Sequence, residues 1–322
     1  MKVVITDYEY ENVEKERKIV EEAGFIFRAY QCRNEEELIQ ACKEADAVIV
    51  QYCEITERVI AAMEHCKMIV KYGIGVNNID TEAASQKGIY VCNVPDYGVD
   101  EVSNHAITMI LALSKKLLKI NNSLKNGIWG YQTAEPLFRM AGKTLGLIGL
   151  GRIPSAVAQK MRGFDLRILA YDPFISAEEG RRRGAEMTSF ETLISESDYI
   201  SIHCPLTEET THLFRESVFK KMKKTAILIN TARGPIVDEK ALAEAVQTGE
   251  IAGAGLDVFE QEPIDKNHLL LHLENVICTP HCAWYSEEAV DAVQRKAALE
   301  AVNVLQGNPP WNAVNKNAVE KR

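Results

Sequence analysis

Short apolar runs alternate with segments of helical apolar spacing along almost the whole chain. In the first hundred residues, five runs have the length and composition of buried strands: Val3–Thr6, Phe25–Tyr30, Ala47–Val50, Met68–Tyr72 and Tyr90–Val94. Helical patterns begin between these runs, near Asn12, Asn34, Thr56 and Asp80. Strands that alternate with helices in this way predict a parallel sheet covered by helices.

The same alternation continues after a long helical stretch from Asp100 to about Lys125. Six further strands are expected, at Leu145–Ile148, Ile168–Tyr171, Tyr199–His203, Ala226–Asn230, Ala252–Leu256 and Val276–Cys278. Helical spacing returns from Ser286 to Leu305, and the polar tail from Asn315 to Arg322 is expected to fray. We interpret the chain as an α/β protein of two doubly wound parallel-sheet domains. Residues 101–283 would form one domain, inserted into the other, which would comprise 1–100 and 284–322.

A glycine turn follows the first strand of the inserted domain. Gly149-Leu150-Gly151-Arg152-Ile153 leads from that strand into a helical pattern, and Asp172 closes the next strand. Glycines let the backbone approach a pyrophosphate, and the helix N-terminus offers unbonded N–H groups. An acid at the second strand tip can bind an adenosine ribose and repels a 2′-phosphate. The pattern predicts a Rossmann-type domain that binds NAD in preference to NADP.

Pro154 occupies the third glycine position of this motif, where a small residue normally lets helix and strand pack closely. Proline is tolerated in a first helical turn because its missing N–H would be unbonded there. We therefore expect a slightly displaced helix with intact phosphate binding. The alternative is a degenerate site that holds no nucleotide.

Composition narrows the class of protein. The chain has 322 residues, 46% of them apolar, and a net charge of −9, which argues against general nucleic-acid or anionic-membrane binding. No apolar run reaches the ~18 residues of a membrane span, and the first apolar stretch is too short for a signal peptide. The eight cysteines form no CxxC pair. We expect reduced thiols, a cytoplasmic location and no metal site.

Three later segments share one layout, in which a buried strand stops at a polar or charged group. Arg233 follows one strand, Asp257 follows the next with Glu262 close behind, and His281 follows the third. In an open parallel sheet these strand ends face the ligand crevice, here expected between the two domains. Arg233 suits a carboxylate beside a carbonyl, and His281 can donate a proton to that carbonyl. Glu262 would stabilise the imidazolium form and orient it.

Each of these residues also has a plainer interpretation when taken alone. An arginine after a strand is usually a surface ion pair, a single histidine is usually a satisfied polar group, and Glu262 could be one of several solvated loop acids. Their order downstream of a nucleotide motif is the more specific signal. It indicates reduction of a carbonyl that lies beside a carboxylate.

At this level of detail the chain resembles the D-isomer-specific 2-hydroxyacid dehydrogenase family over nearly its whole length. The resemblance rests on the segments Tyr72–Asp80, Gly149–Arg152, His203–Thr207, Asn230–Gly234, Leu256–Pro263 and Thr279–His281. It implies that Arg233 orients the substrate, that Glu262 pairs with the histidine, and that His281 is the proton donor. It also implies a flavodoxin-like substrate domain and a homodimer formed through the nucleotide domains, with the helix after residue 100 in the interface.

The same resemblance implies further contacts. Backbone amides around Ile74 and Gly75 would hold the substrate carboxylate, and Lys71 stands where many relatives have an arginine beside the substrate. NAD contacts are expected at Val102, Gly149, Gly151, Arg152, Ile153, Asp172, Cys204, Pro205, Thr210, Thr231, Ala232 and Asp257. The segment His281–Glu287 resembles the branch that contains the C-terminal-binding proteins, in which the residue at Trp284 lines the substrate pocket. Plain packing at a hinge is the alternative for Trp284.

Two functions are compatible with these residues. The first is an NAD-dependent oxidoreductase that interconverts a 2-oxo acid and a D-2-hydroxy acid. The second is a dimeric binding protein that senses NAD(H), like the corepressors of the C-terminal-binding branch, and has little catalysis. The first is favoured because all three catalytic residues are present and no long tail for partner docking is visible.

Overall fold

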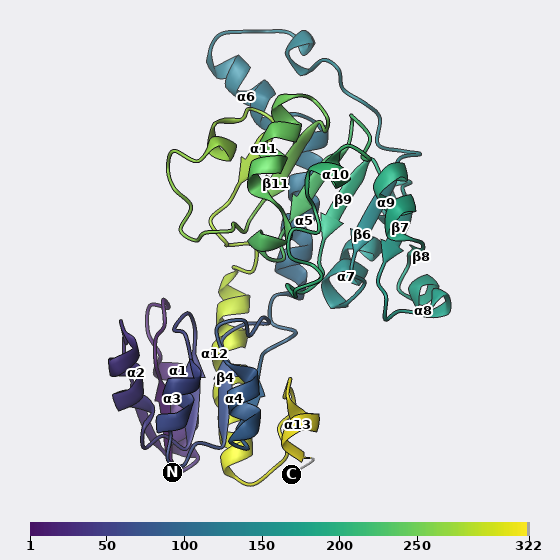
Figure 1. Ribbon diagram of the computed structural model, residues 1–322. Coiled ribbons are helices and arrows are strands. Elements are labelled where there is room, and N and C mark those ends of the chain that lie inside the picture. The colour runs from purple at the N-terminus through teal and green to yellow at the C-terminus, as the bar shows by residue number, and fades with distance from the viewer. Residues whose placement is uncertain (321–322) are drawn as a thin grey trace. The chain divides into compact units, whose positions relative to one another are not determined.

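The computed structural model describes residues 1–320; residues 321 and 322, part of the tail expected to fray, lie outside the described residues. Residue contacts divide the chain into two compact units. Unit 1 comprises Met1–Gly98 and Tyr285–Arg322, and unit 2 comprises Val99–Trp284. The sequence predicts these boundaries after residues 100 and 283. Each unit is an α/β fold built on its own parallel sheet (Figure 1).

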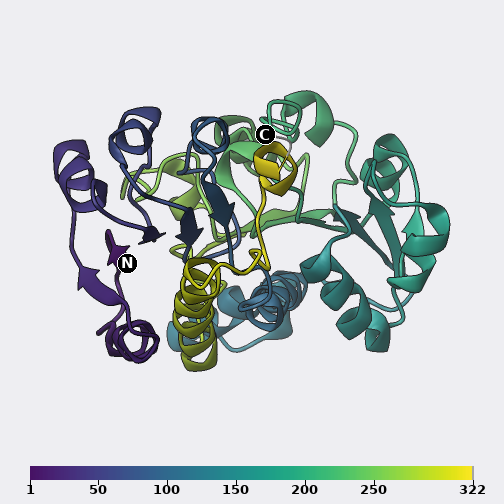
Figure 2. The same cartoon turned by 90° about the horizontal axis from the view of Figure 1, so that it is seen from below.

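Unit 1 is a five-stranded sheet in the order β2-β1-β3-β4-β5. Its strands are β1 (Lys2–Ile5), β2 (Ile26–Ala29), β3 (Ala47–Val50), β4 (Met68–Lys71) and β5 (Tyr90–Cys92). Its helices are α1 (Glu14–Glu22), α2 (Glu35–Cys42), α3 (Glu57–Ala62), α4 (Thr81–Gln86), α12 (Glu287–Leu305) and α13 (Lys316–Glu320). This strand order is that of the flavodoxin-like fold, and Figure 2 shows helices on both faces of the sheet.

Unit 2 is a seven-stranded sheet in the order β12-β11-β10-β9-β6-β7-β8. Its strands are β6 (Thr144–Ile148), β7 (Arg167–Tyr171), β8 (Glu186–Met187), β9 (Tyr199–Ile202), β10 (Ile227–Asn230), β11 (Gly253–Leu256) and β12 (Val276–Cys278). Counted from β6, the order reads 3-2-1-4-5-6 with a seventh strand at the edge, which is the Rossmann arrangement. The expected fold class is confirmed for both sheets. The two-residue strand β8 was not predicted, because it is too short to show a period.

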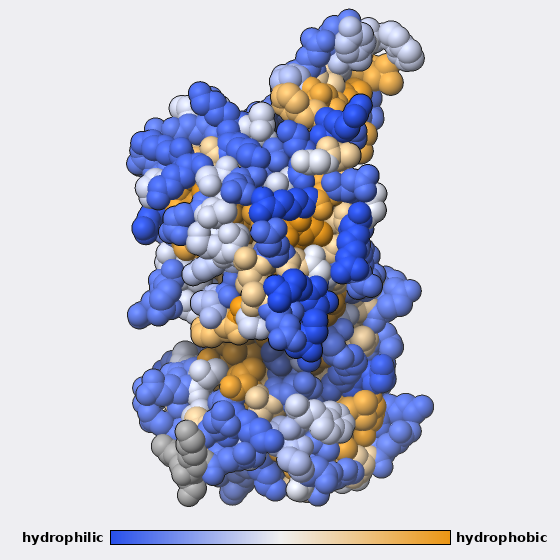
Figure 3. Space-filling model, turned by 90° about the vertical axis from the view of Figure 1, so that its right-hand side faces the viewer, coloured by the Kyte–Doolittle hydropathy of each residue, from blue (hydrophilic) through white to orange (hydrophobic). Residues whose placement is uncertain are grey.

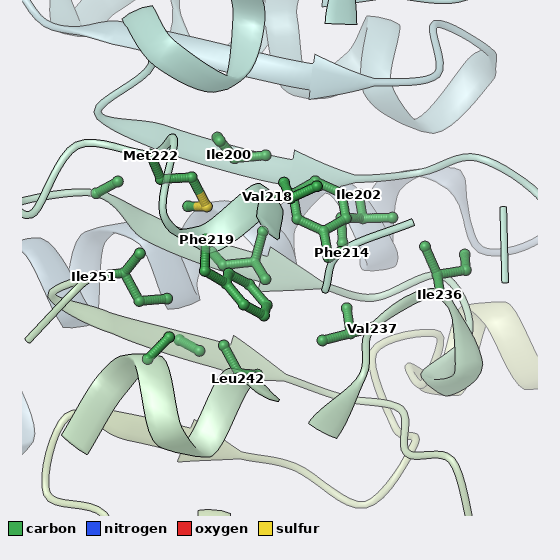
Figure 4. Close-up of a cluster of buried hydrophobic side chains, with 14 of the residues drawn as sticks. Ile200, Ile202, Phe214, Val218, Phe219, Met222, Ile236, Val237, Leu242 and Ile251 are labelled. Atoms are coloured by element: carbon green, nitrogen blue, oxygen red, sulfur yellow. The ribbon is translucent and has the colours of Figure 1, made fainter. Parts of the chain in front are cut away.

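The helices of unit 2 lie on both faces of this sheet. They are α5 (Val99–Ser114), α6 (Leu117–Lys125), α7 (Arg152–Met161), α8 (Ala177–Arg182), α9 (Phe190–Glu196), α10 (Glu216–Phe219) and α11 (Glu239–Gln247). Short 3-10 turns span η1 (Tyr131–Ala134), η2 (Arg162–Phe164), η3 (Gly234–Ile236) and η4 (Leu269–His272). One core fills the face under α9, α10 and α11, where Phe214 and Phe219 are fully buried (Figure 4). The other fills the face under α5 and α7.

Two predicted elements differ from the structure. The single helix expected from Asp100 to Lys125 is broken, because Lys116 adopts a left-handed conformation (φ 49°) between α5 and α6. The tail expected to fray forms α13 as far as Glu320. It is anchored by Asn315, whose side chain accepts the Val91 N–H and donates to the Ile89 carbonyl. These hydrogen bonds tie the tail to β5, the edge strand of the sheet, a context that local polarity does not reveal.

Candidate active site

The residues singled out for unit 2 gather at one edge of its sheet. Each follows the carboxyl end of a parallel strand: Gly149 after β6, Asp172 after β7, Cys204 after β9, Thr231 and Arg233 after β10, Asp257 after β11, and His281 after β12. Because parallel strands all end at the same edge, segments far apart in sequence are adjacent there.

The glycine turn after β6 requires glycine at its first position. Gly149 has φ 87°, and a Cβ atom there would lie 3.1–3.2 Å from the backbone of His203 and Cys204. The Gly149 N–H donates to the Tyr171 carbonyl at 2.8 Å, which ties the turn to the neighbouring strand. Helix α7 begins at Arg152, directly after Gly151. The first N–H groups of this helix therefore lie beside the turn, as in a phosphate-binding loop.

Pro154 lies buried in the first turn of α7, and the helix runs through it to Met161. The first backbone hydrogen bond after it, from Ser155 N to the Gly151 carbonyl, is present at 3.2 Å. Proline at this position removes only an N–H that no intrahelical carbonyl accepts. The helix is thus intact, although Pro154 differs from the small residue that this motif usually has here.

Asp172 supports the glycine turn from the adjacent strand tip. Its carboxylate accepts the Leu150 N–H at 2.9 Å and the Phe174 N–H at 2.9 Å. Both bonds fix the carboxylate at the end of β7. The acid is thereby held where an adenosine ribose would lie in a dinucleotide fold.

Further along the edge, the hydroxyl of Thr231 bears on whether this edge binds a ligand. Its hydroxyl is buried and has no hydrogen-bond partner among residues 1–320. A buried polar group without a partner is costly, so its presence points to a ligand that bonds it. Val102, another expected cofactor residue, lies in α5 and is 7% exposed.

The turn after β9 holds three other expected cofactor residues, Cys204, Pro205 and Thr210. The Thr210 hydroxyl donates to the Pro205 carbonyl at 2.7 Å and so closes the turn. Burial raises the pKa of the Cys204 thiol to about 11, so this residue acts as a neutral thiol. Burial also lowers the pKa of the preceding His203 to about 3, so His203 is neutral and does not exchange protons near pH 7.

The turn after β10 positions Arg233. Asn230, fully buried at the end of the strand, accepts the Ala232 N–H at 3.0 Å and donates to the Arg233 carbonyl at 2.9 Å. The next residue, Gly234, is packed against the loop after β11: a Cβ atom there would lie 1.9 Å from the carbonyl carbon and oxygen of Phe259. Asn230 and Gly234 belong to a motif that the sequence shares with its family, and the structure shows that both are positioning residues.

Glu262 and His281 form a direct pair. His281 Nδ1 lies 2.7 Å from Glu262 Oε2, and Glu262 Oε1 accepts the Phe259 N–H at 2.9 Å. Burial opposes ionisation of Glu262, but the hydrogen bonds from His281 and Phe259 outweigh it and hold the pKa of Glu262 below its usual range. The charge of Arg233 acts in the same direction. Both side chains of the pair are more than a third exposed, so it adds little stability; its effect is to orient the imidazole.

The backbone at His281 is left-handed (φ 51°), which is uncommon for a residue with a side chain. Asp257, 1% exposed, holds this turn: its carbonyl accepts the His281 N–H at 2.8 Å, and its carboxylate accepts the N–H groups of Cys282 and Ala283. Trp284 adds a bond from its indole N–H to the His281 carbonyl at 3.0 Å. The imidazole is therefore presented by a backbone that is fixed from two sides.

The remaining expected residues, Lys71, Ile74 and Gly75, lie in unit 1, at the end of β4 and on the loop that follows it. Lys71 ends that strand, and its ammonium lies 5.4 Å from the centroid of the Tyr52 ring. Asn93 donates to the Ile74 carbonyl at 2.7 Å and so fixes the backbone next to Gly75. The loop thus has a defined conformation within its own unit.

Comparison with known proteins shows to which family the chain belongs. The family model described as the NAD-binding domain of D-isomer-specific 2-hydroxyacid dehydrogenases matches residues 107–283. A glyoxylate reductase of Korarchaeum cryptofilum is 38% identical over 290 residues, which cover 88% of this chain and 87% of that protein. The chain belongs to the D-isomer-specific 2-hydroxyacid dehydrogenase family. It is an NAD-dependent oxidoreductase of that family.

Two other relatives extend the comparison. A D-3-phosphoglycerate dehydrogenase of Archaeoglobus fulgidus is 40% identical over 286 residues, but the chain spans only 54% of its length. The D-lactate dehydrogenase of Aquifex aeolicus, solved with NAD and lactic acid, has a TM-score of 0.87 and 32% identity over 95% of this chain and 96% of that one. In residues 1–320, no helix has both the length and the apolar character needed to cross a bilayer.

Proposed function

We propose that the chain interconverts a 2-oxo acid and a D-2-hydroxy acid, with Arg233, Glu262 and His281 as its catalytic residues. The observation that carries the proposal is the 2.7 Å pair of His281 and Glu262, at the sheet edge that also holds Arg233 and the glycine turn. NAD, when bound, supplies or accepts the hydride. His281 Nδ1 is engaged by Glu262, so Nε2 is the nitrogen that gives its proton to the keto oxygen during reduction.

Arg233 binds the carboxylate and the keto oxygen through its planar guanidinium. In oxidation the direction of the proton reverses, and His281 takes the hydroxyl proton as the hydride leaves C2. We assign unit 1 as the substrate domain. Its backbone amides at Ile74 and Gly75 hold the carboxylate, and Lys71 lies beside the substrate. We assign Trp284 to the substrate pocket as well, in addition to its bond to the His281 carbonyl.

The test is NADH oxidation, followed at 340 nm, against a panel of 2-oxo acids. A dehydrogenase should turn over its substrate at about 1–10³ per second. Tight NADH binding with negligible turnover across the panel would instead favour the nucleotide-sensing alternative. The panel should include glyoxylate, hydroxypyruvate, pyruvate and branched oxo acids, since the same arginine and histidine serve all of them.

Asp172 should set the cofactor preference. We expect kcat/KM to be higher with NADH than with NADPH by at least about tenfold, because a carboxylate beside the 2′-phosphate costs several kcal/mol. Asp172→Asn removes the charge but keeps an acceptor for the Leu150 N–H. In this variant kcat/KM with NADPH should rise, so the preference for NADH should become smaller. Equal efficiencies in the wild-type protein would contradict the assignment.

We further propose a homodimer formed through unit 2. The segment from Leu117 to Phe138 exposes several apolar side chains, among them Ile128, Trp129 (89% exposed) and Tyr131. Figure 3 shows apolar surface gathered at the top of the view, over the part of the molecule that contains α6. A cavity of about 330 Å³ borders this segment. Its lining includes Leu118 and Phe138 from the segment, and Tyr199 and Ile277 from elsewhere in unit 2. Apolar surface of this kind usually marks an interface.

Replacing Trp129 by glutamate should weaken the dimer. Tryptophans at interface centres commonly contribute ~2 kcal/mol or more, so the dissociation constant should rise at least about tenfold. Sedimentation velocity across a concentration series measures it. Phe174→Glu is the matched control, because Phe174 is 92% exposed but lies outside this segment. A dimer unaffected by the Trp129 change would place the interface elsewhere.

The location we propose is the cytoplasm. All eight cysteines, each within the described residues, are free thiols. Unpaired cysteines are typical of a reducing compartment.

A further inference from the structure

A chain of side-chain hydrogen bonds links helix α5 to the turn that carries His281. His105, in α5, has its Nε2 atom 3.0 Å from the Thr279 hydroxyl oxygen. That hydroxyl lies 2.5 Å from Asp257 Oδ1, and His105 Nε2 itself is 3.8 Å from the same oxygen. Three elements, α5 and the segments after β11 and β12, thus meet through one threonine hydroxyl.

The direction of these bonds follows from the donor inventory. The Asp257 carboxylate accepts two backbone N–H groups and can only accept from Thr279 as well, so the Thr279 proton points to Asp257. A hydroxyl has one proton, so the bond between His105 and Thr279 must be donated by His105 Nε2–H. The network therefore assigns the tautomer of His105 and aligns all its bonds toward Asp257.

Asp257 is the residue that fixes the left-handed backbone at His281. Its carbonyl and its carboxylate together hold the N–H groups of residues 281, 282 and 283. If the Thr279 hydroxyl were free to turn, it would cease to hold one carboxylate oxygen in place. His105 prevents this rotation, because it occupies the acceptor side of that hydroxyl.

We propose that His105 is a positioning residue for the proton transfer, acting through Thr279 and Asp257 on the orientation of His281. This inference rests on the proposed role of His281. The network includes Asp257, an expected NAD contact, but neither the glycine turn nor Asp172, so we expect His105 to affect the chemical step more than NADH affinity. A misplaced proton donor lowers the rate of the chemical step, and a displacement of about 1 Å can cost up to ~10²-fold.

The experiment compares His105→Leu with His105→Gln in the full-length protein, because glutamine can still donate an N–H to Thr279. We expect kcat to fall about tenfold or more in the leucine variant and to stay within about threefold of wild type in the glutamine variant. The KM for NADH and the dissociation constant for NADH, measured by fluorescence, should change less than about twofold in both. Equal losses in the two variants, or a loss that appears only in NADH binding, would overturn the proposal.

Thr279 provides an independent arm in case His105→Leu destabilises the fold. Thr279→Ser retains the hydroxyl and should be near wild type, whereas Thr279→Val should lower kcat as His105→Leu does. The double variant His105→Leu/Thr279→Val should be no slower than Thr279→Val alone, because both changes interrupt the same chain. Multiplicative losses would show that His105 acts by another route. A fully active His281→Ala variant would contradict the proposed function. If His281→Ala is inactive and the two His105 variants lose activity equally, only the inference about His105 is rejected.

Discussion

Replacing His281 by alanine should lower kcat by about 10²–10⁴, the usual contribution of a general acid. The physical reason is that the proton for the keto oxygen then has to come from water. The measurement is kcat for NADH oxidation with the best 2-oxo acid of the panel.

The backbone of His281 requires a second variant. Alanine at a positive φ adds strain that is unrelated to proton transfer, whereas asparagine tolerates this conformation well. His281→Asn should therefore be as slow as His281→Ala while its thermal stability stays closer to wild type. If the asparagine variant kept substantial activity, the loss in His281→Ala would come from backbone strain, and the imidazole would not be the proton donor.

Replacing Gly234 by alanine should lower kcat/KM by about 10² or more. The added Cβ would lie 1.9 Å from the Phe259 carbonyl and 2.5 Å from the Glu260 nitrogen, and both contacts are to backbone. The loop that carries Glu262 must then move away from the turn that carries Arg233. A displacement of about 1 Å is enough to cost a factor of this size.

Gly163→Ala is the matched control, because a Cβ at Gly163 meets no atom within 4 Å. This variant should retain wild-type activity and a wild-type melting temperature. For Gly234→Ala, kcat/KM and thermal unfolding should be measured together. Wild-type values of both would mean that the loop after β11 adapts without disturbing the catalytic pair.

The sequence allowed the sheets to be predicted because buried parallel strands are short apolar runs bounded by helical patterns. It also allowed Arg233, Asp257 and His281 to be placed together, since all three follow strands of one sheet and so lie at its carboxyl edge. The helix break at Lys116 could not be predicted. No glycine or proline marks it, and the left-handed residue is a lysine.

The supporting roles of Gly234 and His105 were also beyond sequence reasoning. Gly234 differs from an ordinary turn glycine only by the backbone that passes beside it, which belongs to a segment 25 positions later. His105 looks like one polar position on a helix until α5 packs against the strands after which Thr279 and Asp257 lie. Tertiary contacts of this kind leave no local pattern.

Unit 1 is assembled from both ends of the chain, and this has a consequence for biosynthesis. Helix α12 packs against α1, β3 and β4, and Asn315 bonds to β5, so the first hundred residues cannot complete their core without residues 285–320. Unit 2 is one uninterrupted stretch and can fold as soon as it leaves the ribosome. The N-terminal part of unit 1 is therefore synthesised before unit 2 but completed after it, and it exposes its apolar strands until translation has passed Asn315.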